Sequence, residues 1–184
     1  MVEEEVKVTI FRYDPERDVK PRYEFFRVPY REDLTILGVL RYIYEEYDGS
    51  LAFNYECRFG VCGLCAVKVN GRPILACKTM AQREMVIEPL SNLPVIRDLV
   101  ADRSGFSKAI MRIRPFLERV TPPKTEPEKL KPRNFETYTG ACRCTRCLNC
   151  LSVCPPASAA RNEYSGPAVM VELSKYMFDP RDEG

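Results

Sequence analysis

Nine cysteines gathered into two short groups constrain this chain of 184 residues more than any other feature. The groups are Cys57, Cys62, Cys65, Cys77 and Cys142, Cys144, Cys147, Cys150, Cys154. A secreted disulfide scaffold is typically shorter, with dispersed cysteines in even number. Clustered thiols with an odd count instead indicate metal ligands in a reducing compartment. The sequence has no histidine, which excludes Rieske-type ligation, Cys/His zinc sites and histidine-based catalysis.

The first group has the spacing Cys57-x4-Cys62-x2-Cys65-x11-Cys77. Four thiolates can hold a [2Fe–2S] cluster, and a loop that supplies three of them must wrap closely around the inorganic sulfides. The alternative is a structural zinc site, but zinc sites usually pair two short Cys-x2–4-Cys units. Only Cys62 and Cys65 fit that form, so the spacing predicts the iron–sulfur cluster.

Three other residues of this loop suit an anionic cluster. Gly60 and Gly63 flank Cys62, and glycine lets the backbone turn and approach the cluster at little steric cost. Arg58 offers a compensating positive charge. We therefore expect Arg58, Gly60 and Gly63 to surround the first cluster.

The second group contains the run Cys144-x2-Cys147-x2-Cys150-x3-Cys154-Pro155, which is the run of bacterial ferredoxins. Cys144, Cys147 and Cys150 are the expected ligands of a [4Fe–4S] cluster. The fourth cysteine of such a run ordinarily serves a different cluster, and no cysteine follows Cys154. The fourth ligand is therefore open between Cys154, Cys142 and a residue of a partner chain, and a three-cysteine [3Fe–4S] site is the other alternative.

The beginning of the chain has the pattern of a β-rich domain. Apolar and polar residues alternate over residues 6–10, as in a half-buried strand, and residues 23–28 are its expected hairpin partner. Helical spacing of apolar residues over 36–44 predicts a helix, with Asp33 as the expected N-cap.

A second hairpin follows the first cysteine loop. Asn70-Gly71 suits a type I′ turn between two short strands, and residues 85–87 are expected to form one more strand. Two hairpins packed across one helix predict a β-grasp fold over residues 1–92.

The second half is expected to be helical. We predict helices over residues 95–100, 106–117 and 166–178, with a stiff polar linker at 121–127. The predicted fold class is therefore α+β: an N-terminal β-grasp ferredoxin domain over 1–92, followed by a small α-helical ferredoxin-type domain over 93–184 that holds the cubane-type cluster.

The charge balance excludes other classes of protein. With 28 Lys and Arg against 26 Asp and Glu, the chain lacks the strongly basic profile of a nucleic-acid-binding protein. Three consecutive glutamates stand where a signal peptide would carry positive charge, and no apolar run is long enough to span a bilayer. We expect a cytoplasmic protein with no membrane span of its own.

The ordered motifs resemble the iron–sulfur subunit of the succinate dehydrogenase/fumarate reductase family over nearly the whole chain. The family's [2Fe–2S] loop is similar to Cys57-Arg-Phe-Gly-Val-Cys62-Gly-Leu-Cys65-Ala. The family's segment with the fourth ligand is similar to the stretch from Asn70-Gly to Leu75-Ala-Cys77. Residues 89–100 resemble the stretch between its domains, and Cys144 to Pro155 its first ferredoxin run.

The sequence also departs from that family. A further cysteine run, which in the family completes the [4Fe–4S] site and builds a [3Fe–4S] cluster beside the quinone pocket, is absent before Gly184. The tryptophan and histidine residues that the family uses near its quinone are absent as well. The resemblance therefore implies a shortened relative, or one whose last section lies on another chain, and it does not imply quinone reduction.

The resemblance implies an electron-transfer subunit without catalytic residues or flavin of its own. Its partner would be a FAD-containing oxidoreductase subunit, and a further subunit would accept its electrons. Through those partners the protein would lie at the cytoplasmic membrane face. The first alternative is a freestanding ferredoxin-like shuttle that serves several oxidoreductases. The second is a lyase that uses the open iron of an incompletely ligated cubane.

Overall fold

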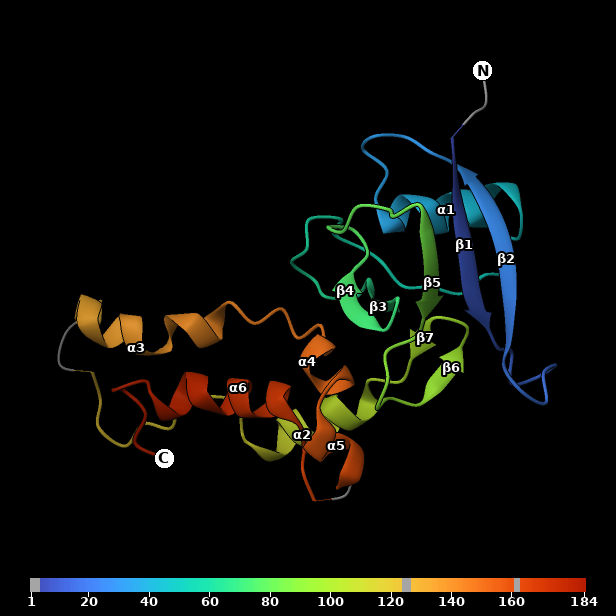
Figure 1. Cartoon of the computed structure of the whole chain (residues 1–184). Coiled ribbons are helices and arrows are strands. Elements are labelled where there is room, and N and C mark those ends of the chain that lie inside the picture. Colours follow the sequence, from blue (N-terminus) through green and yellow to red (C-terminus); the bar gives the residue numbers. More distant parts are fainter. Residues whose placement is uncertain (1–3, 124–126, 161–162) are drawn as a thin grey trace. The chain divides into compact units, whose positions relative to one another are not determined.

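The computed structural model describes residues 4–123, 127–160 and 163–184. The contacts between residues divide the structure into two compact units (Figure 1). The first unit comprises Met1–Asp102 and Thr145–Val153, and the second comprises Arg103–Cys144 and Cys154–Gly184. Each unit has a distinct architecture and is described on its own.

The first unit is built on a five-stranded mixed sheet with the strand order β2-β1-β5-β3-β4. The strands are β1 (Glu5–Arg12), β2 (Arg22–Pro29), β3 (Ala66–Val69), β4 (Arg72–Leu75) and β5 (Glu84–Glu88). β1 pairs antiparallel with β2 and parallel with β5, and β3 pairs antiparallel with β4 and with β5. The predicted β-grasp fold is confirmed.

The helix α1 (Ile36–Glu46) completes the core of this unit (Figure 1). The alternating inward residues of β1 and β5 are fully buried, and so is one face of α1. The shared core contains Val6, Val8, Ile10, Met85, Ile87, Ile36, Val39, Leu40 and Ile43. Burial of this apolar surface, at roughly 25 cal/mol per Å², is the main stabilisation that holds the sheet and helix together.

The turn between β3 and β4 has the predicted chemistry. Asn70 and Gly71 both have positive φ angles, 48° and 79°, as a type I′ turn requires. The Asn70 side chain also accepts a 2.8 Å hydrogen bond from the Val86 amide, which ties the turn to β5.

Two local predictions in this unit are wrong. Thr35, not Asp33, is the N-cap of α1, since its hydroxyl accepts a 3.1 Å hydrogen bond from the Gly38 amide. Residues 95–100 form a short hairpin of β6 (Val95–Arg97) and β7 (Val100–Ala101) rather than a helix. Asp98 lies between those strands with a φ of +44°, a conformation that no α-helix contains.

The second unit is helical. It contains α2 (Ser104–Arg112), α3 (Pro132–Cys142), α5 (Pro155–Ala159) and α6 (Pro167–Met177), and both α2 and α3 pack against α6. The helix predicted over 166–178 is confirmed as α6. The helix predicted over 106–117 ends early, because Arg114 has a positive φ angle and precedes Pro115, where the helical conformation is disfavoured. Of the predicted linker at 121–127, residues 124–126 lie outside the described residues.

The division into units differs from the predicted domain boundary between residues 92 and 93. Residues 93–102 lie with the β-grasp unit because the backbone amides of Asp98 and Leu99 donate to the carbonyls of Tyr13 and Ala52, at 2.8 and 3.1 Å. The segment Thr145–Val153, which contains α4 (Asn149–Ser152), also belongs to this unit although it follows α3 in the chain.

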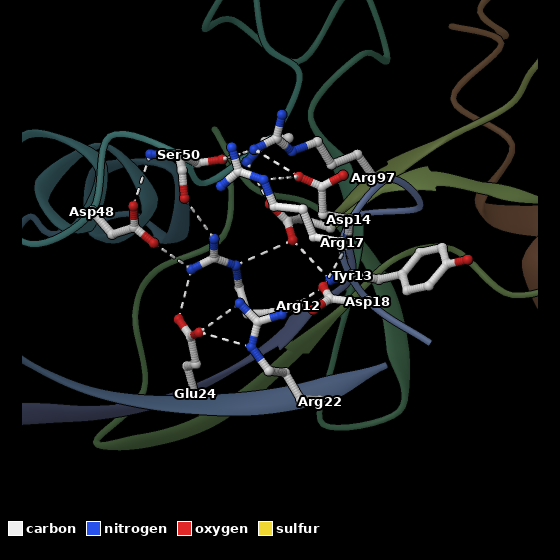
Figure 2. A network of polar contacts seen from close by, with 12 residues as sticks. Arg12, Tyr13, Asp14, Arg17, Asp18, Arg22, Glu24, Asp48, Ser50 and Arg97 are labelled. Carbon is white, nitrogen blue, oxygen red and sulfur yellow. Dashed lines mark hydrogen bonds and ion pairs between the residues drawn. The ribbon is translucent and has the colours of Figure 1, made fainter. Parts of the chain in front are cut away.

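The end of β1 carries a buried arginine that joins three segments of the first unit. Figure 2 shows the Arg12 guanidinium with Glu24 on one side and with Asp48 and Ser50 on another. Its Nη1 donates to both carboxylates at 2.6 Å, and its Nη2 donates to the Ser50 hydroxyl at 2.9 Å. Only 3% of the Arg12 side chain is exposed, so the charge depends on these partners.

No helix within the described part of the chain has both the length and the apolar character needed to cross a membrane.

Candidate metal centres

The first cysteine loop connects α1 to β3 and folds around the thiol of Cys57. The Cys57 sulfur accepts hydrogen bonds from the amides of Phe59 and Val61 at 3.4 Å and of Cys62 at 3.3 Å. These donors stabilise a thiolate and lower the pKa of Cys57 to about 6, the Cys62 amide having the largest effect. The loop therefore presents its backbone donors to the sulfur that it surrounds.

The loop can converge in this way because three of its residues adopt the left-handed conformation. Arg58, Gly60 and Gly63 have φ angles of 59°, 77° and 71°. Successive amides in such turns point toward a common centre and form an anion-binding concavity. Gly60 and Gly63 thus have the backbone conformation expected of them. Arg58 is exposed and takes part in the turn, while its predicted role as a compensating charge stays a prediction.

Cys65 and Cys77 lie at the base of the loop, where the β3–β4 hairpin begins and ends. Both are buried, and the Ala76 amide donates to the Cys65 carbonyl at 3.0 Å, which fixes the two ends of the hairpin together. Burial, the largest effect, raises the pKa of Cys65 to about 11, and Cys62 and Cys77 are close enough to contribute. The structure thus brings Cys57 next to Cys62, and Cys65 next to Cys62 and Cys77.

This arrangement fits a [2Fe–2S] cluster in its donor set and its backbone. Four sulfur donors, backbone amides directed at a sulfur and left-handed turns are what a small anionic cluster needs. As the side chains lie, no group of three or more Cys, Asp or Glu among the described residues could hold a metal ion. The fit therefore rests on the pairwise contacts of the thiols, the amide donors and the turn geometry.

The second cysteine group is distributed over three helices and the loops between them. Cys142 is the last residue of α3 and is exposed, Cys150 lies in α4 and Cys154 is the N-cap of α5. Cys147 and Cys150 belong to the first unit, and Cys144 and Cys154 belong to the second.

Sequence reasoning missed two backbone features of the second group. Arg146 and Leu148 flank Cys147 with φ angles of 54° and 68°, the left-handed conformation found around the first group. Because neither residue is glycine or asparagine, no sequence signal pointed to it. Leu148 is 1% exposed, so burial of its side chain stabilises a conformation that is otherwise costly.

Comparisons with known proteins identify similar iron–sulfur proteins. A family model described as a 2Fe-2S iron-sulfur cluster binding domain matches residues 7–108. An uncharacterized iron-sulfur protein of Methanocaldococcus jannaschii is 40% identical over 97% of the chain, which spans only 35% of that protein. The fumarate reductase iron-sulfur subunit of Haemophilus influenzae is 34% identical over 97% of the chain and 75% of its own length.

A solved structure shares the fold. A solved structure of the Mycobacterium smegmatis Sdh1 complex in the apo form contains a chain that superposes with a TM-score of 0.83 at 23% identity. The match covers 100% of this chain and 78% of that one. The likeness confirms the predicted fold class, a β-grasp domain followed by a helical ferredoxin-type domain.

Proposed function

Because the chain belongs to the iron–sulfur subunit family of succinate dehydrogenase and fumarate reductase, and is thus an iron–sulfur electron-transfer protein, we propose that it relays electrons between a flavoprotein partner and a further acceptor. The clusters supply the redox chemistry, while the protein supplies their position and electrostatic environment.

We assign a [2Fe–2S] cluster to Cys57, Cys62, Cys65 and Cys77. The observation that carries this assignment is the Cys57 sulfur, which accepts three backbone N–H groups while its neighbours Cys62, Cys65 and Cys77 approach one another in pairs. Hydrogen bonds to cluster sulfurs raise the reduction potential of a centre, so this loop both holds and tunes the cluster.

We assign a [4Fe–4S] cluster to Cys144, Cys147 and Cys150, with Cys154 or Cys142 as the fourth ligand; a [3Fe–4S] cluster is the alternative. The spacing of the run supports the assignment, and so do the left-handed residues on both sides of Cys147. The pair of clusters would form a relay from the flavin to the acceptor.

The partner would be a FAD-containing oxidoreductase subunit. The identity of the relatives supports this, since a fumarate reductase iron-sulfur subunit is one component of an enzyme. A flavin exchanges two electrons with its substrate and can pass them singly to the first cluster, which makes a chain of one-electron carriers useful beside it. The exposed loop residues Phe59 and Val61, at 79% and 68% exposure, lie beside Cys57 where such a partner would dock.

Low-temperature electron paramagnetic resonance (EPR) of anaerobically purified protein, combined with iron and sulfide analysis, tests the cluster assignment. A [2Fe–2S] and a [4Fe–4S] cluster give about six irons per chain and two signals after reduction. About five irons, with a signal already present in the oxidised sample, would identify a [3Fe–4S] site. Zinc in place of iron would refute the electron-transfer role.

Purification from the native source tests the partner. Co-elution with a protein that carries FAD, on size-exclusion and ion-exchange columns, is the expected result. A chain that elutes alone, and that several unrelated oxidoreductases reduce equally fast, would refute the subunit assignment and support the shuttle.

A further inference from the structure

Part of the second cysteine group lies directly against the loop of the first. Thr145–Val153, which contains Cys147 and Cys150, belongs to the same compact unit as the β-grasp domain. Cys147 and Cys150 therefore lie in the same unit as the whole first cysteine group.

The two segments approach each other closely at Gly63, a buried residue between Cys62 and Cys65. A methyl group added to Gly63 would lie 2.6 Å from the Thr145 carbonyl oxygen, 2.8 Å from the Cys147 Cα and 2.9 Å from the Cys147 nitrogen. All three atoms are backbone, so they can move only if the whole segment moves. Only a residue without a side chain permits this approach.

The far end of the segment is also fixed to the first unit. The Ser91 amide donates a 2.9 Å hydrogen bond to the buried Ser152 hydroxyl, and the Asn92 side-chain amide donates a 3.0 Å bond to the Leu151 carbonyl. Between the two ends, Leu148 is 1% exposed and α4 packs beside β4. The segment is thus held at both ends and in its middle.

We propose that Gly63 is a positioning residue that sets the separation of the two iron–sulfur clusters, by letting the backbone of Cys147 pack directly on the first cluster loop. The inference rests on the proposed function, because it needs both clusters to be present. Electron transfer between them weakens steeply with distance, and so does their magnetic dipolar coupling. A displacement of the Cys147 segment by the width of a methyl group therefore changes both.

The test compares Gly63→Ala with Gly71→Ala. Both glycines have left-handed backbones, with φ angles of 71° and 79°, so alanine strains both turns similarly. Gly71 has open space around it, with nothing within 4 Å of an added methyl group. With both clusters bound, a difference between the two variants in cluster coupling therefore reports on the contact with Thr145 and Cys147, because the backbone strain is similar in both.

The readout is the microwave power at which the [2Fe–2S] signal of the fully reduced protein saturates, measured with the iron and sulfide content. A nearby paramagnetic cubane speeds the relaxation of the [2Fe–2S] centre. We expect G63A to saturate at clearly lower power than the wild type at equal iron content, and G71A to match the wild type. Loss of the cubane signal alone in G63A would also support the proposal, since the displaced segment carries Cys147 and Cys150.

Other outcomes overturn the inference. Wild-type saturation in G63A with both clusters bound would show that the contact does not set their separation. Loss of the [2Fe–2S] signal in G63A would show that Gly63 serves the first loop alone. A wild-type protein with no clusters would instead refute the proposed function, and one with two uncoupled clusters would refute only this inference.

A second readout needs no paramagnetic signal. Hydrogen exchange followed by mass spectrometry reports the opening of local segments, and we expect Thr145–Val153 to exchange faster in G63A and in Ser152→Ala than in the wild type and G71A. Unchanged exchange in both G63A and Ser152→Ala would show that the segment is not held by these contacts.

Discussion

The Arg12 Nε donates a 3.1 Å hydrogen bond to Asp98 Oδ1 across 86 positions of the sequence. Asp98 is 2% exposed, and its carboxylate also accepts the amides of Tyr13 at 2.8 Å and Ala52 at 2.9 Å. This ion pair therefore ties the end of β1 to the β6–β7 turn, and the bond from the Ala52 amide ties that turn to the segment that leads from α1 toward Cys57. We therefore expect the stability of the first unit to depend on this ion pair.

Removing the cation tests this dependence. Arg12→Met keeps an unbranched side chain but leaves the buried Asp98 carboxylate without a counter-charge. Breaking one partner of a buried ion pair typically destabilises a protein by about 3–5 kcal/mol, and we expect a loss of that order. The measurement is the urea midpoint of unfolding under anaerobic conditions.

Arg17→Met is the matched control. Arg17 has a side chain that is 80% exposed, and its Nε lies as far as 3.9 Å from Asp14 Oδ2. Long ion pairs with a solvent-exposed cation typically contribute about 0–1 kcal/mol. Its urea midpoint should stay near that of the wild type. Equal midpoints for both variants would mean that the Arg12–Asp98 pair does not hold the unit together.

The buried ion pair also shows where sequence reasoning ends. Alternation over residues 6–10 and the Asn70-Gly71 turn predicted the β-grasp because both signals are local, as are the spacings of the cysteines. Nothing local in the sequence pairs Arg12 with Asp98. The helix predicted over 95–100 is wrong for the same reason. Long-range hydrogen bonds hold Asp98 in a left-handed conformation and override the helical propensity of this segment.

The same limit applies to the candidate sites. Gly60 and Gly63 could be assigned to the first loop because glycine signals a left-handed turn. The left-handed Leu148 carries no such signal, because its conformation is stabilised by burial. The contact of Gly63 with Cys147 joins segments that are more than eighty residues apart, so only the folded chain reveals it.

Asp48 gives the first unit a dependence on acid pH. Hydrogen bonds from Ser50, the largest effect, and from Arg12 lower its pKa to about 2 from 3.8. A carboxylate with a depressed pKa in the folded state contributes stability above its unfolded pKa, and that stability is lost as the pH falls through its folded pKa. The free energy of unfolding of the wild type should therefore exceed that of Asp48→Asn at pH 5, and the excess should shrink between about pH 4 and pH 2. A stability difference of this kind is expected in part as slower unfolding of the wild type.

Stopped-flow urea jumps at each pH measure these unfolding rates before the clusters decay. Glu45→Gln is a suitable control, since Glu45 forms an exposed pair with Arg41 on the surface of α1. A difference between wild type and Asp48→Asn that stays constant from pH 5 to pH 2 would contradict the assignment to this carboxylate.

The structure and the sequence-based prediction differ in the residue that caps the N-terminus of α1. Thr35→Ala removes the acceptor of the Gly38 amide, and loss of a threonine N-cap typically costs about 0.5–2 kcal/mol. Asp33→Ala should have little effect, because Asp33 is exposed and lies before the cap. The measurement is the urea midpoint of unfolding of both variants. A larger loss of stability in Asp33→Ala than in Thr35→Ala would identify Asp33 as the N-cap.

Single cysteine substitutions define the ligands of the second cluster. We expect Cys154→Ser to change the EPR signal of that cluster and lower the iron content by about one atom per chain, as conversion to a three-iron cluster would. Cys142→Ser should leave both clusters unchanged, because Cys142 lies outside the run Cys144-x2-Cys147-x2-Cys150-x3-Cys154. Iron analysis and EPR of the reduced proteins are the measurements.

Cys57→Ser calibrates this series, because it should abolish the [2Fe–2S] signal and remove about two irons while the second cluster stays. Loss of the second cluster in Cys142→Ser but not in Cys154→Ser would reverse the assignment of the fourth ligand. If neither substitution alters that cluster, its ligands on this chain are Cys144, Cys147 and Cys150 alone. The oxidised wild-type protein then tells the two remaining cases apart: a signal already present indicates a three-iron site, and a silent sample indicates a fourth ligand on the partner.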